Sequence, residues 1–243
     1  MEGVYRFAQQ NIAVRSLHAA VHALCAPYRT DAAPDFTVET AQADIDFERA
    51  RAAASDAALG RHVRAYADDY LESLAVYRAI CERLPFYDTV LLHGSALCLD
   101  GEAYLFTAPS GTGKSTHARL WREVFGARVT MINDDKPLLR ITDGGVTVYG
   151  TPYNGKHSLG ADMAAPLGAI CLLHRAEENV IRPIRAAEAF PTLLRQVYRC
   201  ADAAAMARTL ALLETLTHSV RLYSLGCNMD PAAARVAREG MKG

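Results

Sequence analysis

Residues 108–116 carry the pattern with the clearest chemical meaning. They read Ala-Pro-Ser-Gly-Thr-Gly-Lys-Ser-Thr, which fits the phosphate-loop pattern G-x-x-x-x-G-K-[ST] except that Ala108 replaces the first glycine. Glycines let backbone N–H groups curve around a phosphate, and the N-terminus of the following helix attracts its negative charge. Lys114 adds a positive charge, and Ser115 adds a hydroxyl that can ligate magnesium. The pattern predicts nucleotide binding by Ser110, Gly111, Thr112, Gly113, Lys114, Ser115 and Thr116.

An acidic pair forms the second candidate group. Asn133-Asp134-Asp135 follows a short apolar strand, which we expect beside the strand that precedes the phosphate loop. A carboxylate at such a strand end can hold the Mg²⁺ that bridges nucleotide phosphates. The other can accept a proton from an attacking hydroxyl, and a neighbouring negative charge can raise its pKa to suit that role. The alternative is a plain turn, in which Asn and Asp are common.

His93 enters the argument through strand register. Asp100-Gly101 is a strong hairpin-turn signal, and a turn there sets His93 opposite Ala108, at the start of the phosphate loop. A core histidine bonded to a nearby carbonyl is the alternative, and a slip of one residue would turn the side chain to the other face.

The surrounding elements must position these residues. A strand before the phosphate loop and an amphipathic helix over residues 117–125 give that loop the context it needs. Further strands are expected at 89–99, 129–132, 138–141, 146–149, 169–174 and 220–225, and helices at 186–199, 202–218 and after Pro231. Alternating strands and helices predict an α/β fold, a mixed sheet flanked by helices, over residues 88–243.

Residues 1–87 read as a small α+β region that could recognise a substrate. A hairpin and a helix are expected before Pro27, a strand at 36–40, and a long amphipathic helix at 59–84. The Ala-rich stretch at 50–58 is interpreted as a flexible join. The division therefore predicts an N-terminal region at 1–87 and a catalytic domain at 88–243.

Composition excludes several classes of partner. The chain has 26 Lys and Arg against 27 Asp and Glu, so it lacks the basic excess that nucleic acid or an anionic membrane attracts. No apolar stretch is long enough to span a bilayer, and neither a secretory signal nor a Cys-x-x-Cys pair is visible. We expect a cytoplasmic protein without a nucleic-acid or membrane partner. Arg175, Arg182 and Arg185 are interpreted as surface charges, with a phosphate-recognising cluster as the alternative.

In combination, His93-Gly94, the 109–116 loop and Asp134-Asp135 resemble the catalytic domain of HPr kinase/phosphorylase. The loop is also similar to that of ATP-dependent phosphoenolpyruvate carboxykinase, and the resemblance covers roughly residues 88–227. It implies ATP and Mg²⁺ as cofactors, with Lys114 stabilising the phosphates and Ser115 and Asp135 holding the metal. Asp134 is then the candidate base and His93 supports that carboxylate, while Lys156, in the loop after Gly150, is the plausible contact of the transferred phosphoryl group.

The implied reaction is transfer of the γ-phosphoryl group of ATP to a hydroxyl. A Ser or Thr of a peptide or small protein is the expected acceptor, and a small-molecule hydroxyl is an alternative substrate. HPr kinases are hexameric, so a homo-oligomer is compatible with the resemblance. Residues 1–87 do not resemble the N-terminal domain of that family, so the acceptor is not inherited. The other hypotheses are a nucleotide-binding regulatory module without transfer activity and a carboxykinase-like enzyme.

Overall fold

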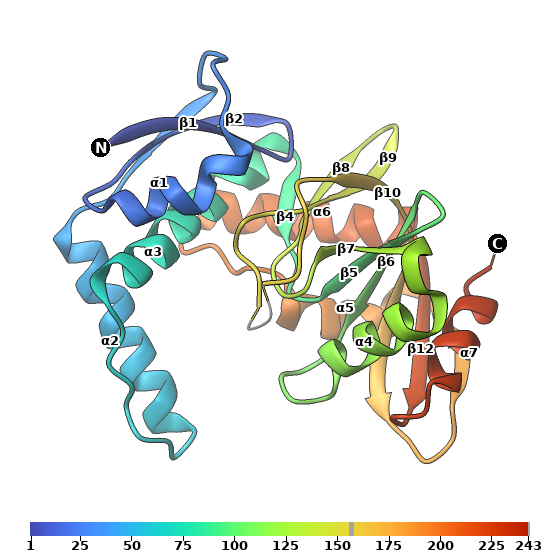
Figure 1. Ribbon diagram of the computed structural model, residues 1–243. Coiled ribbons are helices and arrows are strands. Elements are labelled where there is room, and N and C mark those ends of the chain that lie inside the picture. The colour runs from blue at the N-terminus through green and yellow to red at the C-terminus, as the bar shows by residue number, and fades with distance from the viewer. Residues whose placement is uncertain (156–157, 243) are drawn as a thin grey trace. The chain divides into compact units, whose positions relative to one another are not determined.

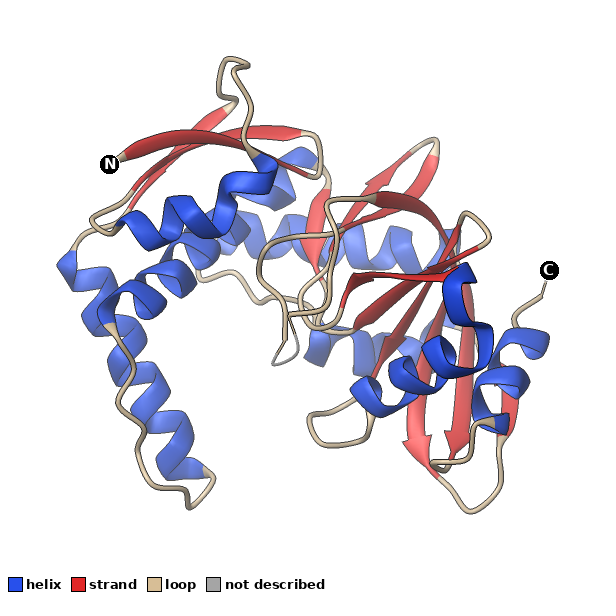
Figure 2. Cartoon of the chain, viewed as in Figure 1, coloured by secondary structure: helices blue, strands red, loops and turns tan. Residues whose placement is uncertain are grey.

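The chain divides into two compact units, an N-terminal unit, Met1–Arg83, and a C-terminal unit, Leu84–Gly243. The computed structural model describes residues 1–155 and 158–242 (Figures 1 and 2). Each unit has its own sheet and its own helices.

The N-terminal unit is built on a hairpin whose alternate residues are buried. Tyr5, Phe7, Ile12 and Val14 are almost fully buried, because successive side chains of a strand point to opposite faces. β1 pairs antiparallel with β2, and β2 pairs parallel with β3. The elements are β1 (Glu2–Phe7), β2 (Gln10–Arg15), α1 (Ala19–Cys25), η1 (Ala26–Tyr28), β3 (Phe36–Glu39), α2 (Gln42–Ala58) and α3 (Asp68–Arg83).

The Ala-rich stretch is a helix, so its interpretation as a flexible join is wrong. Residues 50–58 form the second half of α2, because alanine has the highest helix propensity of all residues. Gly60, with φ of +61°, follows the end of α2, and such a glycine is a common helix stop. The next helix therefore begins only at Asp68 rather than at Leu59.

The C-terminal unit contains a mixed sheet. Its described residues form nine strands in the order β4-β8-β9-β10-β6-β5-β7, with β12 pairing on β10 and β11 on β12. β10 runs parallel to β6 and β12 and antiparallel to β9. The strands are β4 (Thr89–Leu91), β5 (Ser95–Leu99), β6 (Glu102–Thr107), β7 (Val129–Asn133), β8 (Leu138–Thr142), β9 (Gly145–Tyr149), β10 (Ala164–Arg175), β11 (Val180–Pro183) and β12 (Arg221–Cys227).

Helices cover both faces of this sheet. One apolar cluster joins Leu105 and Ile170 of the sheet to Leu193 of α5 and Leu213 of α6. The other joins Tyr104 and Phe106 of the sheet to the helices α4 (Lys114–Phe125) and α7 (Ala232–Gly240). Figure 1 shows α4 and α7 on one side of the strands and α5 and α6 on the other. The unit is therefore mixed α/β, as predicted. Its helices are η2 (Leu84–Tyr87), α4 (Lys114–Phe125), η3 (Gly126–Arg128), α5 (Ala186–Gln196), α6 (Ala203–Ser219) and α7 (Ala232–Gly240).

The hairpin that leads to the phosphate loop has the predicted register. Ser95 pairs with Phe106 and Leu99 with Glu102, across a turn in which Asp100 and Gly101 have φ of +55° and +86°. Positive φ at both turn residues matches the right-handed twist of the strands.

Two expectations about neighbouring strands are wrong. The acidic pair follows β7, but β7 pairs with β5, so β5 separates it from the phosphate-loop strand β6. Residues 89–99 are two strands rather than one: β4 pairs with β8, and β5 with β6 and β7. His93 lies in the break between them.

In the described part of the chain, no helix combines the length and the apolar character needed to cross a bilayer.

Candidate active site

The phosphate loop joins β6 to α4 in the order that the pattern predicts. Gly111 and Gly113 have φ of +80° and +124°, in a region that L-residues with side chains rarely adopt. A Cβ at either position would meet nothing within 4 Å, so the backbone conformation, rather than space, favours glycine there. Residues with side chains would be strained at these two positions of the loop before α4.

Lys114 is the first residue of α4 and is 9% exposed. Its Nζ donates to the carbonyl oxygen of Ala108 at 2.8 Å, so the side chain lies back along the loop. Burial lowers the pKa of this ammonium group, although the negative charge of Asp135 opposes that shift. A buried, incompletely compensated cation at the start of a helix favours an anionic ligand.

Arg175, at the end of β10, also contacts the loop. Its Nη2 donates to the carbonyl of Gly111 at 2.6 Å and its Nε to that of Thr112 at 3.5 Å. The sequence gives no signal for this role, because the contact joins residues more than sixty positions apart. Arg182, by contrast, pairs with Glu188 and remains a surface charge.

Asn133 organises the acidic turn, a role that the sequence interpretation missed. Its Oδ1 accepts from the backbone N–H groups of Asp135 and Lys136 at 2.9 and 2.6 Å. Its Nδ2 donates to the carbonyl and hydroxyl oxygens of Thr151 at 3.2 and 3.0 Å. This fully buried amide fixes the turn and directs the two carboxylates to different partners.

His93 contacts Asp135 and not Asp134, so the expectation that it supports Asp134 is wrong. Its Nε2 lies 3.0 Å from Asp135 Oδ1, and its Nδ1 lies 3.1 Å from Gln196 Oε1. The backbone carbonyl of His93 accepts from Thr107 Oγ1 at 2.7 Å, which holds it beside the end of β6. Gln196 therefore belongs to the site, although nothing in the sequence marks it.

Asp134 faces the loop that follows Gly150. Its Oδ1 accepts from the backbone N–H of Gly155 at 2.5 Å, and the residue is 7% exposed. Lys156, the expected phosphoryl contact, lies outside the described residues. Of the described residues, Gly155 lies directly beside the Asp134 carboxylate.

The two carboxyl groups have opposite electrostatic environments. Burial raises the pKa of Asp134, and the negative charge of Asp135 acts in the same direction, against the hydrogen bond from Gly155. Burial also acts to raise the pKa of Asp135, but the hydrogen bond from His93 and the charges of Lys136, His93 and Lys114 outweigh it, so that pKa is lowered. Asp134 is thus the better proton acceptor of the pair, and Asp135 is the more firmly ionised group.

The donor groups suit magnesium better than a metal held by protein alone. Ser115 is exposed and Asp135 half-buried, and both offer the oxygen ligands that Mg²⁺ prefers. Among the described residues, no group of three His, Cys, Asp or Glu side chains is placed to hold a metal. Mg²⁺ commonly binds to one or two protein oxygen ligands, and nucleotide phosphates and water complete its coordination. A site with few protein ligands fits this pattern.

Comparison with known proteins gives only distant structural likeness. No protein-family model matches the chain, and no curated protein matches its sequence. Among solved structures, the Hpr(Ser) kinase/phosphatase from Coxiella burnetii matches with a TM-score of 0.34 and 9% identity, covering 61% of this chain and 94% of that one. A likeness of this size fixes neither the activity nor the ligand of this chain.

Proposed function

We propose that the chain binds ATP with Mg²⁺ at residues 108–116 and transfers the γ-phosphoryl group to a hydroxyl. One observation carries the proposal: the buried Lys114 begins α4 directly after a turn with two glycines of positive φ, and its Nζ lies back along that loop. The second half of the site is the pair Asp134 and Asp135, whose carboxylates are held by different partners. Phosphoryl transfer requires positioning and charge stabilisation, and these residue types supply both. The motif resemblance of the sequence points to the same reaction.

Each residue then has a defined part. Backbone N–H groups of residues 110–113 and the Lys114 ammonium hold the phosphates, while Ser115 and Asp135 hold Mg²⁺, which neutralises developing charge when bound. Asp134 accepts the proton as the acceptor oxygen forms its bond to phosphorus and the bond from the γ-phosphorus to ADP breaks. His93, fixed by Gln196, keeps Asp135 in place.

The acceptor that we propose is a Ser or Thr hydroxyl of a peptide or small protein. Asp134, whose pKa is raised and whose Oδ1 accepts from the backbone N–H of Gly155, is the group that would take the proton of such a hydroxyl. No contact identifies a particular substrate, so the first experiment offers peptides, free serine and small alcohols together. Transfer in either direction between nucleotide and acceptor uses the same groups.

The test follows the label from γ-³²P-ATP in the presence of Mg²⁺. We expect Asp134→Asn to keep nucleotide binding and to lose transfer, because only the proton acceptor is removed. Lys114→Ala should lose both, and Arg122→Ala, which removes an exposed cation from the same helix, should lose neither. Retained transfer in Asp134→Asn would refute the base assignment, and tight nucleotide binding without transfer to any acceptor would favour a regulatory module.

A further inference from the structure

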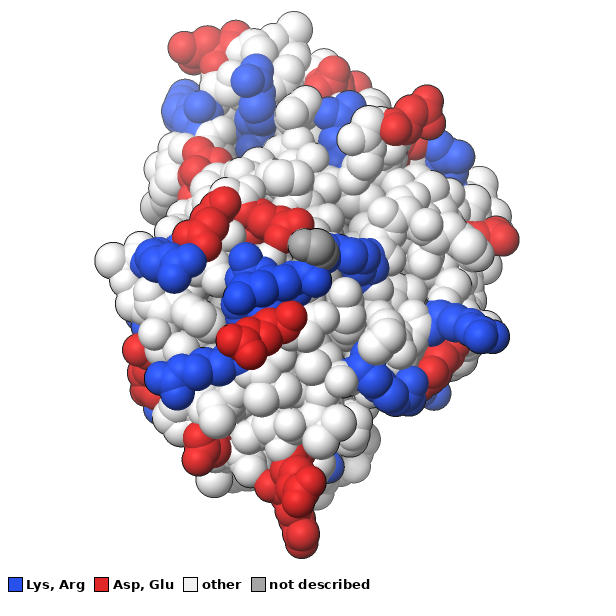
Figure 3. Space-filling model, turned by 90° about the vertical axis from the view of Figure 1, so that its right-hand side faces the viewer, with Lys and Arg blue, Asp and Glu red and all other residues white. Residues whose placement is uncertain are grey.

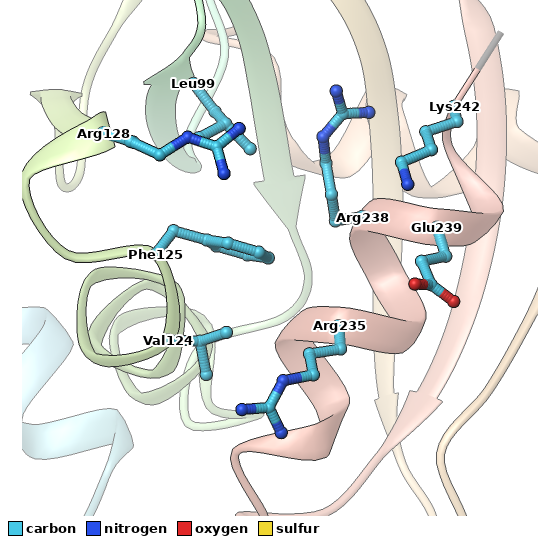
Figure 4. Close-up of a pocket in the computed structure, with 8 residues that line it drawn as sticks. All are labelled: Leu99, Val124, Phe125, Arg128, Arg235, Arg238, Glu239 and Lys242. Atoms are coloured by element: carbon cyan, nitrogen blue, oxygen red, sulfur yellow. The ribbon is translucent and has the colours of Figure 1, made fainter.

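A second group of cations lies around a cavity at the opposite end of α4. The cavity has a volume of about 250 Å³ and lies between η3 with the end of α4 and the helix α7. Arg128, Arg235, Arg238 and Lys242 line it, with Glu239 as the one carboxylate of the lining. Figure 4 shows Phe125 pointing toward α7, with Arg128 and Arg235 on either side of it.

Most of these cations lack a carboxylate partner. Arg128 pairs with Asp100, but Arg235, Arg238 and Lys242 make no ion pair with any carboxylate in the described part of the chain. Arg238 lies over the ring of Tyr104, with 5.3 Å from its Cζ to the ring centroid. Like charges around one cavity repel each other, so an anion bound there would be stabilised by all of them.

The same cations extend the charge beyond the cavity. Arg238 and Lys242 also line a neighbouring hollow with Arg221, whose guanidinium pairs with Glu102 at 3.1 Å. Figure 3 shows that Lys and Arg side chains gather in the middle of this face, interleaved with a smaller group of acidic ones. Asp100 pairs with Arg128 and Glu102 pairs with Arg221. Arg235, Arg238 and Lys242 therefore remain available to a bound anion.

The floor of the cavity is apolar. Val124 and Phe125 of α4 are half-buried there, and Leu99 at the end of β5 is fully buried. A volume of 250 Å³ equals that of about eight liquid water molecules. This is enough for one ring or a short carbon chain that bears a charged group.

We propose that this cavity binds a small organic phosphate monoester, with its dianionic group among Arg235, Arg238 and Lys242 and its carbon body against Phe125. Guanidinium groups bind phosphate oxygens in pairs, and a dianion gains more than a monoanion from several cations. The site is separate from residues 108–116, since Thr116 and Val124 are eight residues and about 12 Å apart along α4. It does not depend on the proposed phosphoryl transfer.

The single tryptophan reports on this cavity. Trp121 is fully buried, and its ring centroid lies 5.2 Å from that of Phe125. The experiment is therefore a fluorescence titration of the full chain, without nucleotide, with phenyl phosphate, inorganic phosphate, benzoate and benzyl alcohol. We expect saturable binding that is tightest for phenyl phosphate and absent for benzyl alcohol.

Variants separate this cavity from the phosphate loop. Arg235→Ala with Lys242→Ala should weaken phenyl phosphate binding at least about tenfold, because two charged hydrogen-bond donors are lost. Lys114→Ala and the matched control Arg122→Ala should leave it unchanged. Equal binding in the double variant, loss of binding in Lys114→Ala, tighter binding of benzoate, or no saturation would each overturn the proposal. Arg235 and Lys242 are both exposed, so we expect the double variant to fold, and circular dichroism checks this.

Discussion

At the scale of single residues, the strand, the glycine turn and the helix around residues 108–116 could be predicted from the sequence because they depend on consecutive residues. The carboxylate that His93 contacts could not be predicted in this way. Asp134 and Asp135 are adjacent, and which of them faces His93 depends on the turn that the buried Asn133 amide imposes through Thr151. Gln196 and Arg175 escape prediction for a related reason, since each reaches the site from a distant strand or helix.

Gly155 is the residue whose substitution most directly tests the position of Asp134. A Cβ there would lie 3.1 to 3.2 Å from the Asp134 carboxylate, so the carboxylate would have to shift. We expect Gly155→Ala to lower kcat about tenfold, because small displacements of a reacting group are costly, and to leave the Kd for nucleotide unchanged. Gly144→Ala is the matched control, since its Cβ would meet only Thr142 Oγ1 at 3.7 Å. An unchanged kcat in Gly155→Ala would argue against a role for Asp134 in transfer.

The raised pKa of Asp134 predicts the pH dependence of transfer. A base must be deprotonated, so kcat/KM should fall as the pH drops through the pKa of Asp134, at a pH above the ordinary aspartate value of 3.8. Any residual activity of Asp134→Asn should lack this acid limb. Initial rates between pH 4 and 8, with circular dichroism at each pH, test the prediction, and an identical limb in both proteins would contradict it.

At the scale of elements, hairpins were predictable and strand neighbours were not. The Asp100-Gly101 turn fixes the register of β5 and β6 locally. β5 lies between β6 and β7 because it also pairs antiparallel with β7, and no short turn connects β5 to β7. The local sequence pattern therefore does not predict this strand order. In the Ala-rich half of α2 the local signal was sufficient, because the helix propensity of alanine predicts a helix there. The interpretation as a flexible join considered only the biased composition.

Glu72 of α3 joins three elements of the N-terminal unit. Its buried carboxylate accepts from the backbone N–H groups of Leu17 and His18 at 2.6 and 2.8 Å and from Thr40 Oγ1 at 2.7 Å. We expect Glu72→Gln to destabilise this unit by about 1–3 kcal/mol, because an acceptor of several hydrogen bonds is weakened. Hydrogen exchange of residues 1–83 measures the change, with the exposed Asp31→Asn as the control.

The same carboxylate makes the stability of this unit depend on pH. Burial acts to raise the pKa of Glu72, but the hydrogen bonds from Leu17, Thr40 and His18 outweigh it and hold the pKa below its usual 4.5. Its contribution to stability is therefore complete above the unfolded value and is lost as the pH falls through the folded one. Glu72→Gln should abolish this component, and an equal acid sensitivity in the variant would assign it to other groups.

At the scale of the whole molecule, every described residue of the candidate active site lies in the C-terminal unit, from His93 to Gln196. The unit has its own two apolar clusters, one on each face of its sheet. We therefore expect residues 84–243, produced alone, to fold and to bind ATP with an affinity within about threefold of the full chain, a difference below 1 kcal/mol. Circular dichroism and a nucleotide titration test this, with Lys114→Ala in the same fragment as the control for binding at the loop. If the fragment folds but transfers only to free serine, while the full chain also phosphorylates peptides, residues 1–83 recognise the acceptor. A fragment that is unfolded, or folded without affinity for nucleotide, would contradict the assignment of the whole nucleotide site to this unit.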